Sequence, residues 1–176
     1  MFESNRGGDT DIYVYKIGQG ILTLPGLNSP GVDADPSISG DGSQIAFQSD
    51  RGGDFDIYVY DLNARAFIEV PGLNTGYDER GPDLSADGTR VAFRSERPDE
   101  SVDGSSDIFI YDMNQKSYVP LRGGWLNTRG GEYLPSLNAD GTLLSFTGLE
   151  RADGISNLAD VYLYDLRFHC QVGRIF

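Results

Sequence analysis

The sequence predicts an all-β protein built from repeated units of four short antiparallel strands. A segment at Ser4–Lys16, SNRGGDTDIYVYK, returns at Ser49–Asp61 as SDRGGDFDIYVYD, with ten of its thirteen residues unchanged. Aromatic and β-branched runs alternate with turns rich in Gly and Asp, which is typical of strands and hairpins. No apolar period typical of a helix extends over a convincing length. These observations together indicate a repetitive all-β fold.

The second unit shows the four strands, here named A to D in chain order. Strands A (PSIS, from Pro36) and B (QIAFQS, from Gln44) are joined by a turn at Asp41-Gly42. Asp-Gly between two apolar runs is a strong hairpin signal, because the turn needs positive φ. Strand C (IYVYDL) follows the loop DRGGDFD, and strand D (AFIEV) precedes the loop PGLNTGYD.

The period of the repeat indicates the architecture. An aspartate opens strand C in each unit, and the spacings between successive copies are 45, 51 and 53 residues. These aspartates are Asp11, Asp56, Asp107 and Asp160. Four strands in a unit of this length are typical of the blades of a β-propeller. Strand C is apolar on both faces, as expected for a strand covered by a neighbouring blade on each side.

We therefore predict a β-propeller of four-stranded antiparallel blades, with about four blades in this chain and the first incomplete. The whole chain, 1–176, is one propeller or a propeller fragment, with blade units 1–33, 34–78, 79–131 and 132–176. Blade 1 lacks strand A because Met1 aligns with Ala46, and blade 4 must form strand D from RFHCQVGRIF. The chain could belong to a longer propeller, close as a four-bladed ring, or form a homo-oligomer that completes a ring.

Composition excludes several classes of function. The chain has 14 Lys+Arg against 27 Asp+Glu, a net charge of −13, which argues against nucleic acid and against an anionic membrane surface. No apolar run approaches 18 residues, so we expect no membrane insertion. Cys170 and His169 are the only residues of their types, and no phosphate loop, dinucleotide fingerprint, zinc motif or Gly-x-Ser-x-Gly motif occurs. We expect that the protein is not an enzyme and that it binds no cofactor.

The unit Pro-x-(Ile/Leu)-Ser-x-Asp-Gly-x-x-(Ile/Val)-Ala-Phe, followed by Ser-(Asp/Glu)-Arg and Asp-Ile-(Tyr/Phe)-(Val/Ile)-Tyr-Asp, resembles the TolB-type (WD-like) β-propeller repeat over nearly the whole chain. The resemblance implies a propeller that acts as a non-enzymatic adaptor through one face, in the periplasm or cell envelope. The start MFESNRGGD is not a signal peptide, so a cytoplasmic location stays open. The same repeat occurs in peptidase propellers, so it is specific for fold rather than function.

The long loops favour one face for binding. The B–C and D–A loops are long and polar and share one face, while the A–B and C–D turns are short and share the other. Long loops on a rigid scaffold commonly carry function, so we expect a protein or peptide partner there. The candidate partner-binding residues, which differ between blades, are Asp33, Asp35, Tyr77, Glu79, Arg97, Trp125 and Arg129.

The repeated residues are expected to be structural. These are Arg6, Arg51, Asp11, Asp56, Asp107 and Asp160, and we expect an Arg–Asp brace inside each blade. Asp33 and Asp35, in a segment without a repeated twin, are weak candidates for Ca²⁺, which carboxylates suit. They fail the EF-hand pattern because Ile38 stands where Gly is required. We expect no bound metal, with Ca²⁺ as the open alternative.

Two other functions stay open at this stage. A carbohydrate-binding or glycoside-active propeller would need a pair of carboxylates in the channel, and strand A offers only Asp83. A self-assembling structural remnant would need no ligand at all.

Overall fold

The computed structural model describes residues 1–97, 105–122, 126–127, 130–150 and 158–174, and this part of the chain is all-β. Blade 1 contains β1 (Phe2–Ser4), β2 (Asp11–Tyr13), β3 (Tyr15–Lys16) and β4 (Gly20–Ile21). Blade 2 contains β5 (Asp33–Ile38), β6 (Gln44–Ser49), β7 (Asp56–Asp61) and β8 (Ala66–Ile68). Blade 3 contains β9 (Glu79–Leu84), β10 (Arg90–Ser95), β11 (Asp107–Asp112) and β12 (Ser117–Tyr118). Blade 4 contains β13 (Glu132–Leu137), β14 (Leu143–Glu150), β15 (Leu158–Asp165) and β16 (Cys170–Arg174).

Blades 2, 3 and 4 are four-stranded antiparallel sheets whose strands pair in chain order. The predicted strand D of blade 4 is confirmed, because β16 pairs with β15. Blade 1 is incomplete, as predicted: its pairs β1–β2 and β3–β4 form two small sheets. Its strand C is interrupted at Val14, whose carbonyl nevertheless accepts a hydrogen bond from the Leu22 amide at 2.8 Å.

The predicted Asp-Gly turns join strands A and B in each complete blade. Asp41 is held by hydrogen bonds from Ser39 and Ser43, and the next residue, Gly42, has a φ of +70°. Asp87-Gly88 and Asp140-Gly141 repeat the arrangement. The positive φ explains why glycine follows the aspartate each time.

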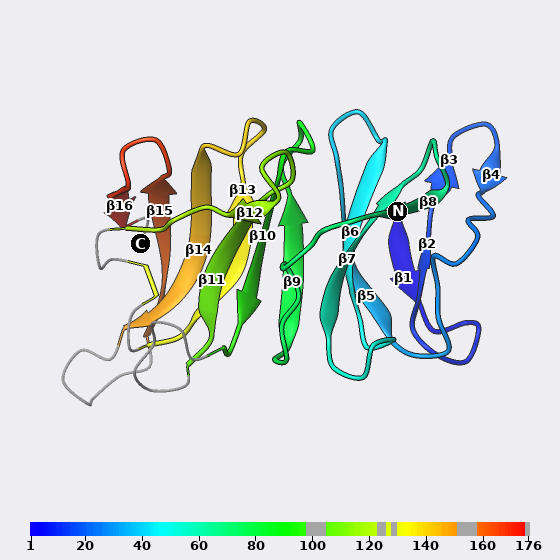
Figure 1. Cartoon of the computed structure of the whole chain (residues 1–176), viewed down its shortest axis with the longest axis horizontal. Coiled ribbons are helices and arrows are strands. Elements are labelled where there is room, and N and C mark those ends of the chain that lie inside the picture. Colours follow the sequence, from blue (N-terminus) through cyan, green and yellow to red (C-terminus); the bar gives the residue numbers. More distant parts are fainter. Residues whose placement is uncertain (98–104, 123–125, 128–129, 151–157, 175–176) are drawn as a thin grey trace.

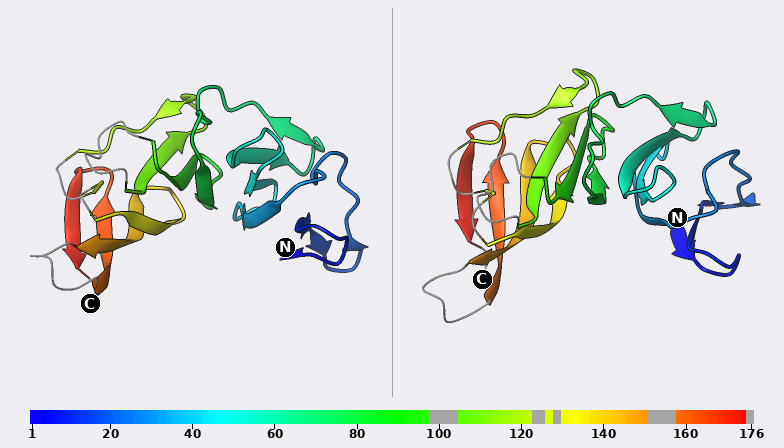
Figure 2. Two further views of the ribbon diagram at one scale, coloured as in Figure 1. Left: turned by 90° about the horizontal axis from the view of Figure 1, so that it is seen from below. Right: turned by 60° about the horizontal axis from the view of Figure 1, so that its bottom comes forward.

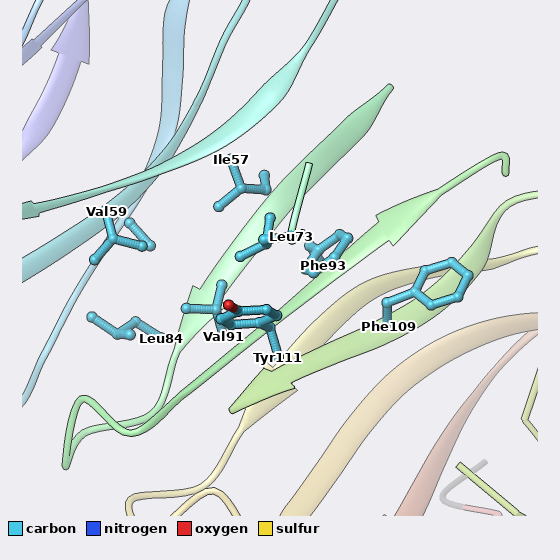
Figure 3. Packing of buried hydrophobic residues seen from close by; sticks show 9 residues of the cluster. Ile57, Val59, Leu73, Leu84, Val91, Phe93, Phe109 and Tyr111 are labelled. Atoms are coloured by element: carbon cyan, nitrogen blue, oxygen red, sulfur yellow. The ribbon is translucent and has the colours of Figure 1, made fainter. Parts of the chain in front are cut away.

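The hydrophobic core lies between blades rather than inside one sheet. Figure 3 shows Ile57 and Val59 of β7 facing Val91 and Phe93 of β10, with Leu73 from the intervening loop between them. Blades 1 and 2 share a second cluster and blades 3 and 4 a third. Strand C is buried on both faces because each face belongs to a different cluster, which confirms the sandwiched strand expected from its apolar pattern.

The blades follow one another along an arc that does not close on itself, and the two termini lie near its two ends (Figure 2). The D strands lie on the convex side of the arc and the A strands on the concave side (Figure 2). Strand D is short in blades 2 and 3, so each of these sheets ends in only a short edge strand on the convex side.

Candidate functional site

The candidate site is the face that carries the B–C and D–A loops, at the lower side of Figure 1. The short A–B and C–D turns lie at the opposite, upper side (Figure 1). This arrangement follows from the antiparallel order of the strands in each blade. Two predicted partner residues of this face, Trp125 and Arg129, lie outside the described residues.

Strand A begins earlier than the sequence predicts. The sequence predicts that strand A of blade 2 starts at Pro36, but β5 starts at Asp33, and β9 and β13 start at the equivalent positions, Glu79 and Glu132. Asp33 pairs with Ser49, and a β-bulge then shifts the register between Ala34 and Ser37. A bulge inserts an extra residue, so the alternation that marks a strand is lost from the sequence.

The bulge residue occupies the same place in three successive blades and has a different side chain in each. Asp35, Gly81 and Leu134 have φ values of 49°, 60° and 52°. This left-handed conformation is uncommon for residues other than Gly, Asn and Asp. The Asp35 side chain is exposed, and Leu134 is 77% exposed. The bulge therefore presents variable side chains from an invariant backbone position.

The preceding blade holds the bulge in place. The Asp35 amide donates to Glu3 Oε2 at 2.9 Å, and the Gly81 amide donates to Gln48 Oε1 at 2.9 Å. Glu3 and Gln48 occupy equivalent positions on strand B of their blades. Arg94 stands at this position in blade 3, and its guanidinium lies 5.6 Å from the ring centre of Tyr133.

Charges of both signs meet around Asp35. Although the Asp35 side chain is exposed, partial desolvation by its neighbours and the charge of Glu3 raise its pKa, while Arg94 and Arg80 act to lower it. Arg80 pairs with Asp78 at 2.7 Å and lies over the ring of Phe55, 3.6 Å from its centre. The face therefore combines paired charges with exposed apolar side chains.

Asp33 is not a unique loop carboxylate, which corrects the expectation from sequence. The equivalent strand positions hold Glu79 and Glu132, and all three side chains are buried. Asp33 Oδ2 accepts hydrogen bonds from the amide and hydroxyl of Ser29, and Glu79 accepts the same two bonds from Thr75. Burial raises the pKa of Glu79, and the bonds from Thr75 partly offset this effect. Asp33 and Glu79 thus bind the D–A loop that precedes them through hydrogen bonds. Their role in partner binding stays a prediction.

The repeated arginine also has a different partner from the one expected. Arg51 Nη2 lies 2.6 Å from Asp33 Oδ1 and donates to the Leu27 carbonyl as well. Asp56, the expected partner of Arg51, instead accepts a bond from the Tyr58 hydroxyl at 3.3 Å. The predicted Arg51–Asp56 brace is therefore wrong, and the arginine joins strand B to the preceding D–A loop.

In three blades this arginine stacks on an aromatic ring. The Arg51 guanidinium lies 4.7 Å from the ring centre of Tyr58. Arg6 lies 3.9 Å from Tyr13, and Arg97 lies 3.5 Å from Phe109. Stacking on aromatic faces suits a guanidinium. Arg97 thus takes part in a repeated arginine–aromatic contact. Its role in partner binding stays a prediction.

Sequence reasoning missed a clamp made by the asparagine of the PGLN loops. The side-chain amide of Asn74 accepts from the Ile57 amide and donates to the Ile57 carbonyl, both at 3.0 Å. Asn28 clamps Ile12 and Asn127 clamps Ile108 in the same way. The recurrence of Asn after Gly-Leu or Trp-Leu was the available signal. Each clamp holds the second residue of strand C.

The geometry leaves Asp33 little capacity for a metal ion, because its two oxygens bind Arg51 and Ser29. In the described ranges, no three side chains of His, Cys, Asp or Glu gather in a way that could hold a metal. Binding of Ca²⁺ stays the open alternative of the sequence analysis.

Asp83, the carboxylate singled out on strand A, ties three A strands together. It accepts from the Ser37 hydroxyl of β5 at 3.3 Å and from the Leu137 amide of β13 at 2.6 Å. Burial raises its pKa, and these hydrogen bonds partly offset the effect. These contacts give Asp83 a structural role on the concave side.

Two cavities occupy equivalent places in blades 2 and 3, between strand D and the following loop. The cavity in blade 2, of about 320 Å³, is lined by Phe67, Val70 and Asn74 among others. The cavity in blade 3, of about 180 Å³, is lined by the equivalent residues, Tyr118, Leu121 and Asn127 among them. Their recurrence makes them a property of the blade rather than a site of one blade.

Comparisons with known proteins agree with this architecture. No family model and no curated protein matches the chain. The crystal structure of TolB from Acinetobacter baumannii matches with a TM-score of 0.69 and 24% identity, over 96% of this chain and 38% of that one. A putative TolB from Agrobacterium tumefaciens matches with a TM-score of 0.66 and 21% identity, over 97% and 59%. The β-propeller domain of the Trilobed protease from Pyrococcus furiosus matches with 0.56 and 17%, over 82% and 42%.

Because the sequence identities lie between 17% and 24%, the similarity to these structures shows the fold alone. The chain is an array of β-propeller blades with a TolB-like fold, and it spans 38% and 59% of the two TolB chains. One of the matching propellers belongs to a protease, so the fold alone does not choose between binding and catalysis. The described part of the chain has no helix that could span a membrane.

Proposed function

We propose that the chain is a non-enzymatic binding module that engages a protein or peptide through its long-loop face. The binding surface consists of the bulge residues Asp35, Gly81 and Leu134 together with Tyr77 in the D–A loop between blades 2 and 3. The resemblance of the repeat to the TolB type implies an adaptor role of this kind.

The arrangement of the three bulges supports the proposal most strongly. The same backbone position holds Asp35, Gly81 and the exposed Leu134 in successive blades. The surface chemistry therefore differs from blade to blade, while the backbone conformation stays the same. Tyr77 is 47% exposed, and tyrosine is one of the residues that most often anchor a binding interface. Arg80 and Asp78 supply a paired charge close to Tyr77 in sequence.

Selection of peptides from a displayed random library on the immobilised chain tests the proposal. The affinity of an enriched peptide is then measured for the wild type, Leu134→Asp and Tyr77→Ala. We expect each substitution to weaken binding at least about tenfold, which is the loss typical of an anchor residue. Aspartate at position 134 should fold, because Asp35 already adopts the same conformation.

Phe168→Asp is the matched control. Phe168 belongs to the same blade and is 73% exposed, but it lies in the C–D turn on the opposite face. We expect this control to bind like the wild type. Binding lost in Phe168→Asp but kept in both test variants would contradict the proposal, as would a library from which nothing is enriched.

A further inference from the structure

Two arginines stand directly opposite each other at the loop face of blade 3. Arg80 of β9 and Arg94 of β10 are partners in the register of these antiparallel strands. Side chains of directly opposite residues lie on the same face of a sheet, and like charges there are destabilising. The equivalent pairs in blades 2 and 4 are uncharged: Ala34–Gln48 and Tyr133–Thr147. The opposed charges therefore need an explanation specific to blade 3.

The two arginines differ in their partners. Arg80 donates to Asp78 Oδ2 from Nε at 3.1 Å and from Nη2 at 2.7 Å, and its guanidinium also stacks on Phe55. Arg94 makes no hydrogen bond and no ion pair with any described residue, and its guanidinium lies 5.6 Å from the ring centre of Tyr133. Arg80 is thus held in place, while the Arg94 guanidinium keeps its capacity to bind an anion.

The strand position of Arg94 accepts a hydrogen bond in the two preceding blades. In blade 1, Glu3 accepts one from the Asp35 amide of the next blade. In blade 2, Gln48 accepts one from the Gly81 amide in the same way. A guanidinium has donors and no acceptor, so Arg94 cannot make this bond to blade 4. The contact that the repeat assigns to this position is therefore unavailable to Arg94.

Two carboxyl groups of the chain lie within electrostatic reach of this arginine pair. Desolvation acts to raise the pKa of Asp35 and of Asp78, and the charges of both arginines act to lower them. Asp78 is already bound to Arg80, and the exposed Asp35 carboxylate forms no ion pair with any described residue. The chain therefore provides Arg94 with no ion-pair partner of its own among the described residues.

Open space adjoins the arginine pair. Gly81, the bulge residue next to Arg80, has no side chain. Apart from its chain neighbours, no atom of the described residues lies within 4 Å of the point where a side chain at Gly81 would begin. A ligand group can therefore approach the pair from the bulge of blade 3.

We propose that Arg80 and Arg94 form a subsite for a carboxylate of the bound peptide, either an Asp or Glu side chain or the C-terminus. The inference rests on the proposed binding of a peptide at the loop face, and it names the chemistry that one part of this face selects. Arg94 suits a carboxylate because a guanidinium binds it through two parallel hydrogen bonds. The bound anion also relieves the repulsion between the two opposed arginines.

A basic partner is the alternative, because the net charge of −13 favours it over the molecule as a whole. Arg94 would repel a basic group at this part of the loop face. The subsite also adjoins an apolar anchor of the proposed binding surface, since Tyr133, which Arg94 approaches, is followed by the exposed Leu134. These local contacts favour a peptide that combines a carboxylate with an apolar side chain.

The affinity of modified peptides for the wild type and for Arg94→Gln tests the inference. A peptide is selected on the wild type from a random library displayed with a free C-terminus, and it is then synthesised in three forms. One is unchanged, one has its Asp and Glu changed to Asn and Gln, and one has an amidated C-terminus. Removal of the recognised carboxylate should weaken binding to the wild type at least about tenfold, as expected for a lost charge-assisted hydrogen bond. Arg94→Gln should bind that form and the unchanged peptide equally.

Arg65→Gln is the charge-matched control, because Arg65 is exposed in the C–D turn of the opposite face. This variant should keep the wild-type preference for the unchanged peptide. The melting temperature of Arg94→Gln should not fall below that of the wild type, because the substitution removes a like-charge pair and no ion pair. A clear fall would overturn the inference by showing that Arg94 has a structural role.

The failure of this inference and the failure of the proposed function give different results. A peptide that loses affinity in Leu134→Asp but binds Arg94→Gln as well as the wild type would overturn the carboxylate subsite and leave the proposed function intact. Equal binding of all three peptide forms to the wild type would overturn the subsite too, as would a basic peptide that binds Arg94→Gln more tightly. A library from which nothing is enriched would overturn the proposed function and this inference with it.

Discussion

In blades 1 to 3, single side chains bind backbone groups that no neighbouring strand pairs with. The asparagine of the D–A loop satisfies both backbone groups of the second residue of strand C. The buried acid at the start of strand A satisfies the loop that precedes it. Buried backbone groups need such partners, which explains why Asn and an acid recur at these places.

We expect Asn74→Ala to lower the free energy of unfolding by about 1–3 kcal/mol, because it leaves the amide and carbonyl of Ile57 without their partner. Denaturation in urea measures the change. Asn63→Ala, in an exposed C–D turn, is the matched control and should change stability by less than about 0.5 kcal/mol. Equal effects of the two substitutions would contradict the clamp.

Asp83→Asn should change how stability depends on pH. Burial raises the pKa of Asp83 in the native state, so the folded protein binds this proton more tightly than the unfolded chain does. The stability that Asp83 contributes is therefore present at low pH and is lost as pH rises through the raised pKa. Unfolding followed from about pH 4 to pH 7 should show the wild type losing stability relative to the variant.

Asp87→Asn is the control of opposite sign. Although burial acts to raise it, the hydrogen bonds from Ser85 and Thr89 hold the pKa of Asp87 below its ordinary value. The wild type should lose stability relative to this variant as pH falls toward and below about 4. If Asp83→Asn and Asp87→Asn show the same pH dependence, the assigned directions are wrong.

At the scale of the element, the loop after strand D is as much a part of the core as the strands are. Leu27, Leu73 and Leu126 each enter one of the three interblade clusters. In the sequence this loop reads as polar and turn-forming, since Pro, Gly and Asn surround the buried leucine. The repeated leucine was visible in the sequence, but its burial between two blades was not.

We expect Leu73→Ala to destabilise the protein by about 2–5 kcal/mol, the cost of a cavity at a fully buried position. Leu134→Ala, the same change at an exposed bulge, should cost less than about 0.5 kcal/mol. Thermal or urea denaturation of the two variants gives the comparison. Similar losses from both would show that the loop leucine does not belong to the core.

The sequence predicted strands B and C from their aromatic and β-branched runs, and it predicted the Asp-Gly turns, because both signals are local. It did not predict the start of strand A, because the bulge at Asp35 hides the register among residues that resemble a loop. It also paired Arg51 with Asp56, the nearer acid in sequence. The actual partner, Asp33, begins β5 of the same blade and pairs with Ser49, so the register of β5 against β6 brings it next to Arg51.

At the scale of the whole molecule, the repeat determines where function can vary. The repeated arginine stacks on an aromatic ring and the repeated asparagine clamps a backbone group, each in three blades. The interfaces between blades contain the hydrophobic core. The four-bladed array and its incomplete first blade followed from the sequence, because the period and the missing strand A are counted along the chain. The sequence could not predict whether the blades close into a ring. It left open a fragment of a longer propeller, a four-bladed ring and an assembly of several chains.

Hydrogen exchange of the chain with and without a selected peptide tests the central claim, binding at the loop face, most directly. We predict slower exchange at the bulges around Asp35, Gly81 and Leu134, with no change in the C–D turns of residues 62–65, 113–116 and 166–169. Protection confined to these turns, with the bulges unchanged, would contradict the account.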